Sequence, residues 1–119
     1  MKTHHDPLGS AASLGEILAE LAKIIDERAG GDPEASWTAK LLAGGPALTA
    51  KKLGEEGVEA ALAVANQSDK EVAAEAADLV YHLLVALRSR GVSLDAVAKV
   101  LEARQGQSGL AERAARPQG

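Results

Sequence analysis

The sequence predicts an all-α protein, an antiparallel bundle of about five helices that is completed by homodimerisation. Apolar residues recur at helical spacing in successive segments, and Ser, Gly and Pro residues mark where those segments begin and end. No segment alternates in the manner of a strand, and short connections place neighbouring helices antiparallel. The chain has no Phe, one Trp and one Tyr. Because small side chains bury little area each, we expect a second copy to complete the core.

The first half of the chain contains a flexible tail and two of the helices. Residues 1–12 show no helical period and are interpreted as a tail, which leaves residues 13–119 as one all-α domain. Ser13 with Glu16 three residues later predicts a capping box that begins the first helix, and Gly30 ends it. We then expect Asp32 to act as an N-cap and Pro33 to open a short helix. Its apolar residues are Trp37, Leu41 and Leu42.

Three further helices follow, and the first two of them are rich in acidic residues. The first acidic helix can open at Pro46 and runs to about Asn66. Ser68 predicts a second capping box and begins the second acidic helix, which ends at Gly91. Ser93 caps a last helix, and the polar residues from Gln105 onward form a C-terminal tail.

The acidic residues form one stripe on each of these two helices. At about 100° per residue, Glu56 and Glu59 share a stripe with Lys52, and Glu55 lies beside it. On the second helix, the stripe holds Glu71, Glu75, Asp78 and His82. The rest of both helices is apolar, which predicts that they are buried. Carboxylates that face an apolar interior need a compensating cation.

The two stripes therefore predict a metal site. Antiparallel packing lets them face each other, so four carboxylates can surround one or two Mg²⁺ ions. These are Glu56, Glu59, Glu75 and Asp78. Solvated charged faces are the alternative. A di-iron site needs Glu-x-x-His, and neither pair has the required histidine; we interpret His82 as a hydrogen-bonded core residue. The net charge of −4 disfavours a nucleic-acid-binding protein, and no apolar run has the length of a membrane helix.

Four segments in this order resemble phosphoribosyl-ATP pyrophosphatases, which belong to the MazG-like all-α nucleoside triphosphate pyrophosphohydrolases. The segments are SWTAKL at 36–41, KKLGEEGVE at 51–59, EAADLVYHLL at 75–84, and LEAR at 101–104 with SG at 108–109 and ER at 112–113. The resemblance spans nearly the whole chain. Two positions depart from it: Trp37 stands where the family more often has Tyr, and Gln105 stands where His is frequent.

The resemblance implies a cytoplasmic hydrolase that cleaves phosphoribosyl-ATP to phosphoribosyl-AMP and pyrophosphate, the second step of histidine biosynthesis. Water would attack between the α and β phosphates, with metal assistance. The implied catalytic residues are Glu55, Glu56 and Lys52, and the implied substrate-binding residues are Lys40, Lys51, Lys52, Trp37 and Arg104. Lys52 stands one helical turn before Glu56, so it can meet phosphate oxygens. Arg113 and Arg116 are either further phosphate ligands or surface charges.

Two other functions remain open. One is a house-cleaning pyrophosphohydrolase that acts on non-standard nucleotides. The other is a non-catalytic helical dimerisation module, in which basic residues of another chain would pair with the acidic stripes. Segment 36–41 and the Ser108-Gly109 pair favour the phosphoribosyl-ATP pyrophosphatase.

Overall fold

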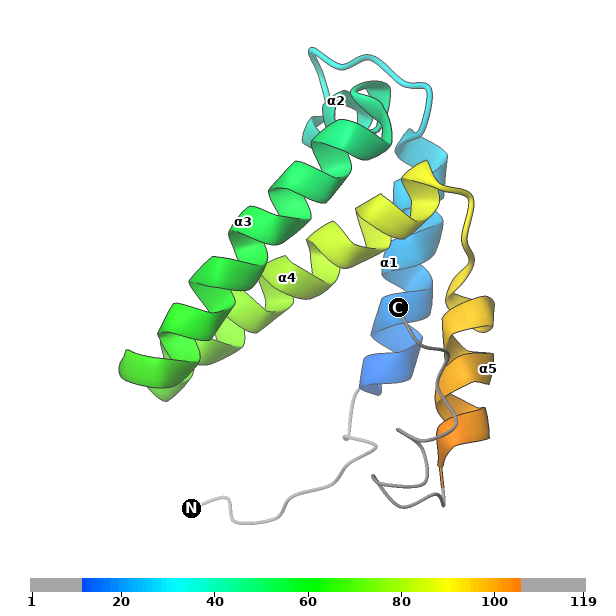
Figure 1. Cartoon of the computed structure of the whole chain (residues 1–119). Coiled ribbons are helices and arrows are strands. Elements are labelled where there is room, and N and C mark those ends of the chain that lie inside the picture. Colours follow the sequence, from blue (N-terminus) through cyan, green and yellow to red (C-terminus); the bar gives the residue numbers. More distant parts are fainter. Residues whose placement is uncertain (1–11, 106–119) are drawn as a thin grey trace.

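The computed structural model describes residues 12–105, which form five helices and no strand (Figure 1). The helices are α1 (Leu14–Arg28), α2 (Trp37–Ala43), α3 (Gly45–Asn66), α4 (Asp69–Ser89) and α5 (Leu94–Arg104). Helices α3 and α4 form a long antiparallel hairpin, and α1 crosses the C-terminal half of α4. The all-α prediction is confirmed, whereas homodimerisation stays a prediction. Most of the two expected tails, with Arg113 and Arg116, lies outside the described residues.

Serine side chains begin four of the five helices. Ser13 and Ser68 form complete capping boxes with Glu16 and Glu71, as the sequence predicts. Ser93 accepts a hydrogen bond from the backbone N–H of Ala96 at 3.0 Å. These caps satisfy backbone donors that the first turn of a helix leaves unpaired, so the ends of the helices are fixed by local chemistry.

The prediction for the start of the short helix is wrong. Asp32 accepts a hydrogen bond from the backbone N–H of Glu34 at 2.9 Å and closes a turn over residues 33–35, so Pro33 lies outside the helix. The chain is extended again at Ser36, and the Ser36 hydroxyl caps α2 by accepting from the N–H of Ala39 at 3.1 Å. Ser36, rather than Asp32, is therefore the N-cap.

The core lies where α1, α2 and α4 meet, at the root of the hairpin. It consists of Ile25, Leu41, Leu84 and Val85, all nearly inaccessible to solvent. The outer part of the hairpin extends past α1 without a helix to cover it (Figure 1). Val58, Leu62 and Val64 there are 59–70% exposed. The expectation that the acidic helices are buried on all sides is therefore wrong for the single chain, because no described element reaches their outer apolar faces.

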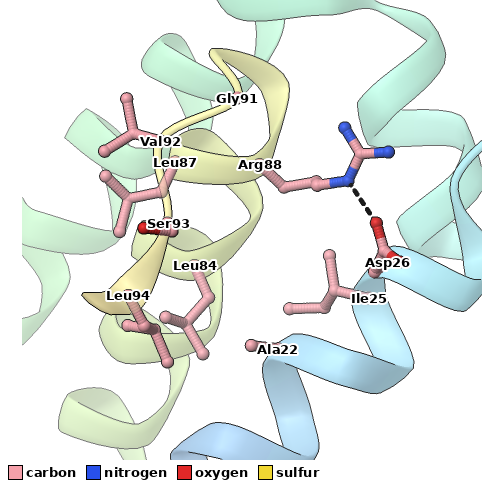
Figure 2. A pocket seen from close by; sticks show the side chains of 10 residues that line it. All are labelled: Ala22, Ile25, Asp26, Leu84, Leu87, Arg88, Gly91, Val92, Ser93 and Leu94. Carbon is pink, nitrogen blue, oxygen red and sulfur yellow. Dashed lines mark hydrogen bonds and ion pairs between the residues drawn. The ribbon is translucent and has the colours of Figure 1, made fainter. Parts of the chain in front are cut away.

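Helix α5 packs loosely against the rest of the described chain and has no buried residue. Between α5, α1 and the end of α4 lies a cavity of about 370 Å³, lined mainly by apolar side chains (Figure 2). An ion pair joins Arg88 Nε to Asp26 Oδ1 at 2.8 Å beside this cavity. Among residues 12–105, no helix combines the length and the hydropathy that crossing a membrane requires.

Candidate metal centre

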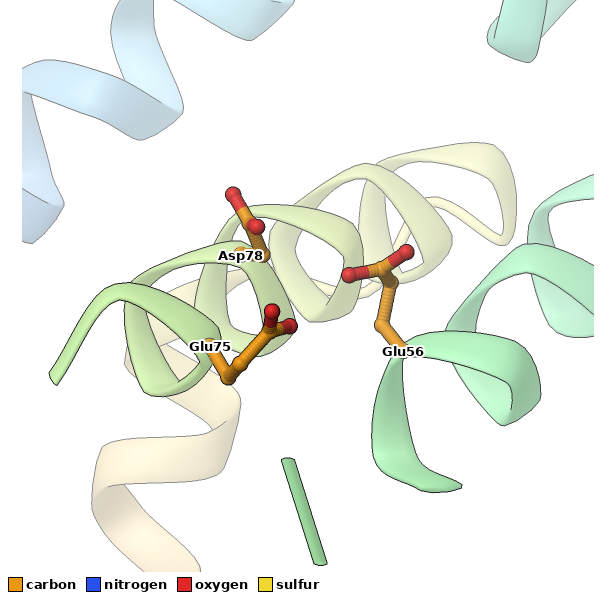
Figure 3. Close-up of side chains that lie close together, drawn as sticks. All are labelled: Glu56, Glu75 and Asp78. Atoms are coloured by element: carbon orange, nitrogen blue, oxygen red, sulfur yellow. The ribbon is translucent and has the colours of Figure 1, made fainter. Parts of the chain in front are cut away.

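Three carboxylates converge in the middle of the hairpin (Figure 3). Glu56 comes from α3, and Glu75 and Asp78 come from successive turns of α4. Each offers one oxygen atom, and these three oxygens lie within 4.8 Å of one another. Only Gln67 and Ser68 connect the two helices, so the middle of α3 is held beside the first half of α4.

Glu75 is the most perturbed member of this carboxylate group. Its Oε1 atom is buried and has no hydrogen-bond partner in the described part of the chain. Burial raises the pKa of Glu75 above its ordinary value, and repulsion from Glu59, Asp78, Glu56 and Glu71 raises it further. A carboxylate in this position needs a proton or a cation to stabilise it.

Three other residues of the predicted acidic stripes lie outside this group. Glu59 is exposed and acts on Glu75 through its charge, but its carboxylate is not among the converging three. Glu71 accepts a hydrogen bond from the backbone N–H of Ser68 at 3.1 Å and serves as a cap. His82 donates from Nδ1 to the backbone carbonyl of Asp78 at 2.9 Å, so it is hydrogen-bonded as predicted, but it is only partly buried and does not belong to the core.

Basic side chains and one aromatic ring gather around Lys52, one helical turn before Glu56 on α3. Lys52 Nζ stands 3.4 Å from Glu55 Oε1 and 6.0 Å from the centroid of the Trp37 ring. Lys40 Nζ approaches the same ring at 5.9 Å. Trp37, Lys40 and Lys52 thus form one group, which we call the Trp37 cluster. It joins α2 to the turn of α3 that precedes Glu56.

The remaining predicted substrate-binding residues, Lys51 and Arg104, lie on α3 and α5. Lys51 is exposed on α3, and Arg104 is exposed at the last residue of α5. The structure also reveals a contact that the sequence analysis did not anticipate, a hydrogen bond between Thr38 Oγ1 and Tyr81 Oη at 2.5 Å. Both residues lie within the segments that carry the resemblance, but nothing in the sequence marks them as partners.

The donor set fits a hard divalent cation. Three carboxylate oxygens converge, one of them buried and unpaired, and such cations prefer oxygen ligands. A helical hairpin with carboxylates that could hold a cation, and with a basic and aromatic group that includes Lys52, one turn before Glu56, defines an all-α protein suited to metal-assisted chemistry on an anionic substrate.

Comparison with known proteins identifies the family. A family model described as phosphoribosyl-ATP pyrophosphohydrolase (PRA-PH) matches residues 18–105. The phosphoribosyl-ATP pyrophosphatase of Caulobacter vibrioides is 56% identical over 103 residues, which cover 87% of this chain and 95% of that protein. The protein of the same name from Methylobacterium radiotolerans is 57% identical over 99 residues, covering 83% and 92%. The chain therefore belongs to the phosphoribosyl-ATP pyrophosphohydrolase family.

Proposed function

We propose that this chain hydrolyses phosphoribosyl-ATP to phosphoribosyl-AMP and pyrophosphate, the second step of histidine biosynthesis. The observation that carries the proposal is the family match over residues 18–105, which includes the carboxylate group and the Trp37 cluster. Relatives at 50–57% identity bear the name phosphoribosyl-ATP pyrophosphatase. A cytoplasmic location is part of the same proposal.

The cofactor in this proposal is Mg²⁺, which Glu56, Glu75 and Asp78 would hold; Glu59, which lies outside the three converging carboxylates but whose charge acts on Glu75, would be a fourth ligand. The buried and unpaired oxygen of Glu75 supports this choice, because a bound cation would remove the repulsion that raises its pKa. When bound, the metal would neutralise phosphate charge and polarise the scissile phosphoryl group. Mg²⁺ commonly binds through a few carboxylates together with substrate phosphates.

The chain's own residues would bind the substrate and orient the water. Lys52 lies one turn before Glu56, and its ammonium group can exchange Glu55 for a phosphate oxygen. Glu55, once released, or Glu56 would accept a proton from the attacking water. Trp37 and Lys40 would contact the nucleotide from α2, while Lys51 and Arg104 would meet more distant phosphates.

A homodimer built through α3 and α4 is part of the proposal. The outer faces of these helices expose Val58, Leu62, Val64 and Leu83, which are 40–70% accessible in the single chain. Apolar residues exposed together on one hairpin favour burial against another protein surface. A second copy presents the same residues, so two copies would bury these apolar side chains against each other in a self-complementary interface.

Product analysis tests the reaction. The protein is incubated with phosphoribosyl-ATP, ATP and several non-standard nucleoside triphosphates, each with Mg²⁺ and with excess chelator. We expect Mg²⁺-dependent release of pyrophosphate, with phosphoribosyl-ATP preferred. Faster cleavage of the non-standard nucleotides would indicate a house-cleaning enzyme, and no cleavage at all would indicate a dimerisation module. Release of single phosphate, or full activity in chelator, would contradict the proposal.

A further inference from the structure

One hydrogen bond joins α4, which carries Glu75 and Asp78, to α2, which carries Trp37 and Lys40. Tyr81 lies one turn after Asp78 on α4, and its hydroxyl meets the hydroxyl of Thr38 at 2.5 Å. Thr38 directly follows Trp37 and stands two residues before Lys40 on α2. The bond thus connects two groups that the proposed reaction needs at a fixed separation.

Helix α2 depends on its surroundings for its orientation. Its sequence, residues 37–43, is too short to form a stable helix alone. The buried side chains of Ala39 and Leu41 hold it against the core, but apolar contacts are not directional. A hydrogen bond is directional, and Thr38 is only 9% exposed, so water cannot readily replace its partner. The Thr38–Tyr81 bond therefore restricts rotation of α2 about its own axis.

Trp37 itself has few restraints. Its side chain is 50% exposed, and the two lysine ammonium groups stand about 6 Å from its ring. The neighbouring Thr38 contributes the direct hydrogen bond from α2 to α4. Because both residues are on α2, a rotation of this helix would shift Trp37 and Lys40 together relative to the carboxylate group on α3 and α4.

We propose that Tyr81 is a positioning residue that sets the substrate affinity of the site by holding Trp37 and Lys40 in place through Thr38. It acts on binding rather than on the chemical step, because none of the three carboxylates lies on α2, the helix that this bond orients. The inference rests on the proposed function, since it takes Trp37 and Lys40 as substrate contacts.

Tyr81→Phe removes only the hydroxyl, and Ser89→Ala is a matched control. Ser89 forms another part-buried hydroxyl pair, with Thr49 at 2.8 Å, and this bond joins α3 to α4 without involving a residue of α2. We expect both variants to lower the melting temperature. Only Tyr81→Phe should raise KM, by about fivefold for one neutral hydrogen bond, with kcat changed less than about twofold. Thr38→Val should reproduce this effect, and Thr38→Ser should retain the wild-type KM.

Two further measurements separate positioning from general stability. In a Trp37→Ala/Lys40→Ala background, Tyr81→Phe should leave KM unchanged, because the groups it positions are gone. Trp37 is the sole tryptophan of the chain, so its fluorescence anisotropy reports on α2 without any substrate. Anisotropy should fall in Tyr81→Phe and stay unchanged in Ser89→Ala.

Two results would overturn the inference and are distinct from each other. If Trp37→Ala and Lys40→Ala leave KM unchanged, the proposed substrate contacts are wrong and the positioning role is wrong with them. If those two variants raise KM while Tyr81→Phe behaves like Ser89→Ala, the substrate contacts stand and the positioning role alone is wrong.

Discussion

The substitution Lys52→Ala tests the proposed role of Lys52 in substrate binding, because we expect it to reduce catalysis much more than stability. Lys52→Ala removes a partly exposed ion pair with Glu55, one turn away, worth about 0.2–0.5 kcal/mol. It also removes the approach to the Trp37 ring at 6.0 Å, worth about 0.5–1 kcal/mol at an exposed site. The free energy of unfolding should therefore fall by about 1.5 kcal/mol at most.

Catalysis should suffer more than stability. A lost charge-assisted hydrogen bond to a phosphate oxygen costs about 1.5–3 kcal/mol. That loss lowers kcat/KM by about 10- to 150-fold. The assay is steady-state pyrophosphate release from phosphoribosyl-ATP at saturating Mg²⁺, combined with denaturant unfolding of each variant.

Lys99→Ala on α5 is the matched control. Lys99 is another helix-surface lysine with an ion pair, to Asp95 at 3.3 Å, and it has no proposed role in the site. Its substitution should leave kcat/KM unchanged. If Lys52→Ala also keeps kcat/KM within about twofold of wild type, Lys52 is only a surface residue and the reasoning is refuted.

Three further predictions concern the carboxylates and the assembly. Glu75→Gln should abolish or sharply reduce activity yet raise the melting temperature in chelator, because it removes a repelled charge; a lower melting temperature in chelator would contradict this. In metal-free wild type, the raised pKa of Glu75 means that the folded state holds more protons than the unfolded state. Stability should therefore fall as pH rises from the ordinary glutamate pKa of about 4.5 through the raised value, and Mg²⁺ should restore it; flat melting curves across this window would count against converging carboxylates. Leu62, 59% exposed, should lie in the dimer interface, so Leu62→Glu should yield monomers in sedimentation experiments where wild type is dimeric; a wild type that is a stably folded monomer at micromolar concentration would refute the interface.

The fold was largely predictable because capping residues in the local sequence specify where most of the helices begin. Ser13 with Glu16 and Ser68 with Glu71 form the capping boxes that their spacing predicts. The prediction at Asp32 was wrong because the local sequence around an aspartate is the same whether it caps a single turn or a helix. What decides between them here is the extended backbone at Ser36, which lets the Ser36 hydroxyl cap the next helix.

The candidate site was predictable only in part. Helical spacing and a short connection were enough to place Glu56 near Glu75 and Asp78. The rotation of α3 about its axis depends on packing, so the sequence could not show that Glu59 lies outside this group. The Thr38–Tyr81 bond joins residues far apart in the chain, and neither hydroxyl has a local pattern that identifies its partner.

The brief connection at Gln67 and Ser68 has a consequence for folding kinetics. Both halves of the carboxylate group belong to one local hairpin, whose closure requires little loss of chain entropy. Local contacts of this kind form early, so we expect the hairpin to be structured in the folding transition state. Repulsion among the carboxylates would then slow folding itself. Mg²⁺ should accordingly accelerate refolding more than it retards unfolding, which makes the ion a partner in the assembly of its own site.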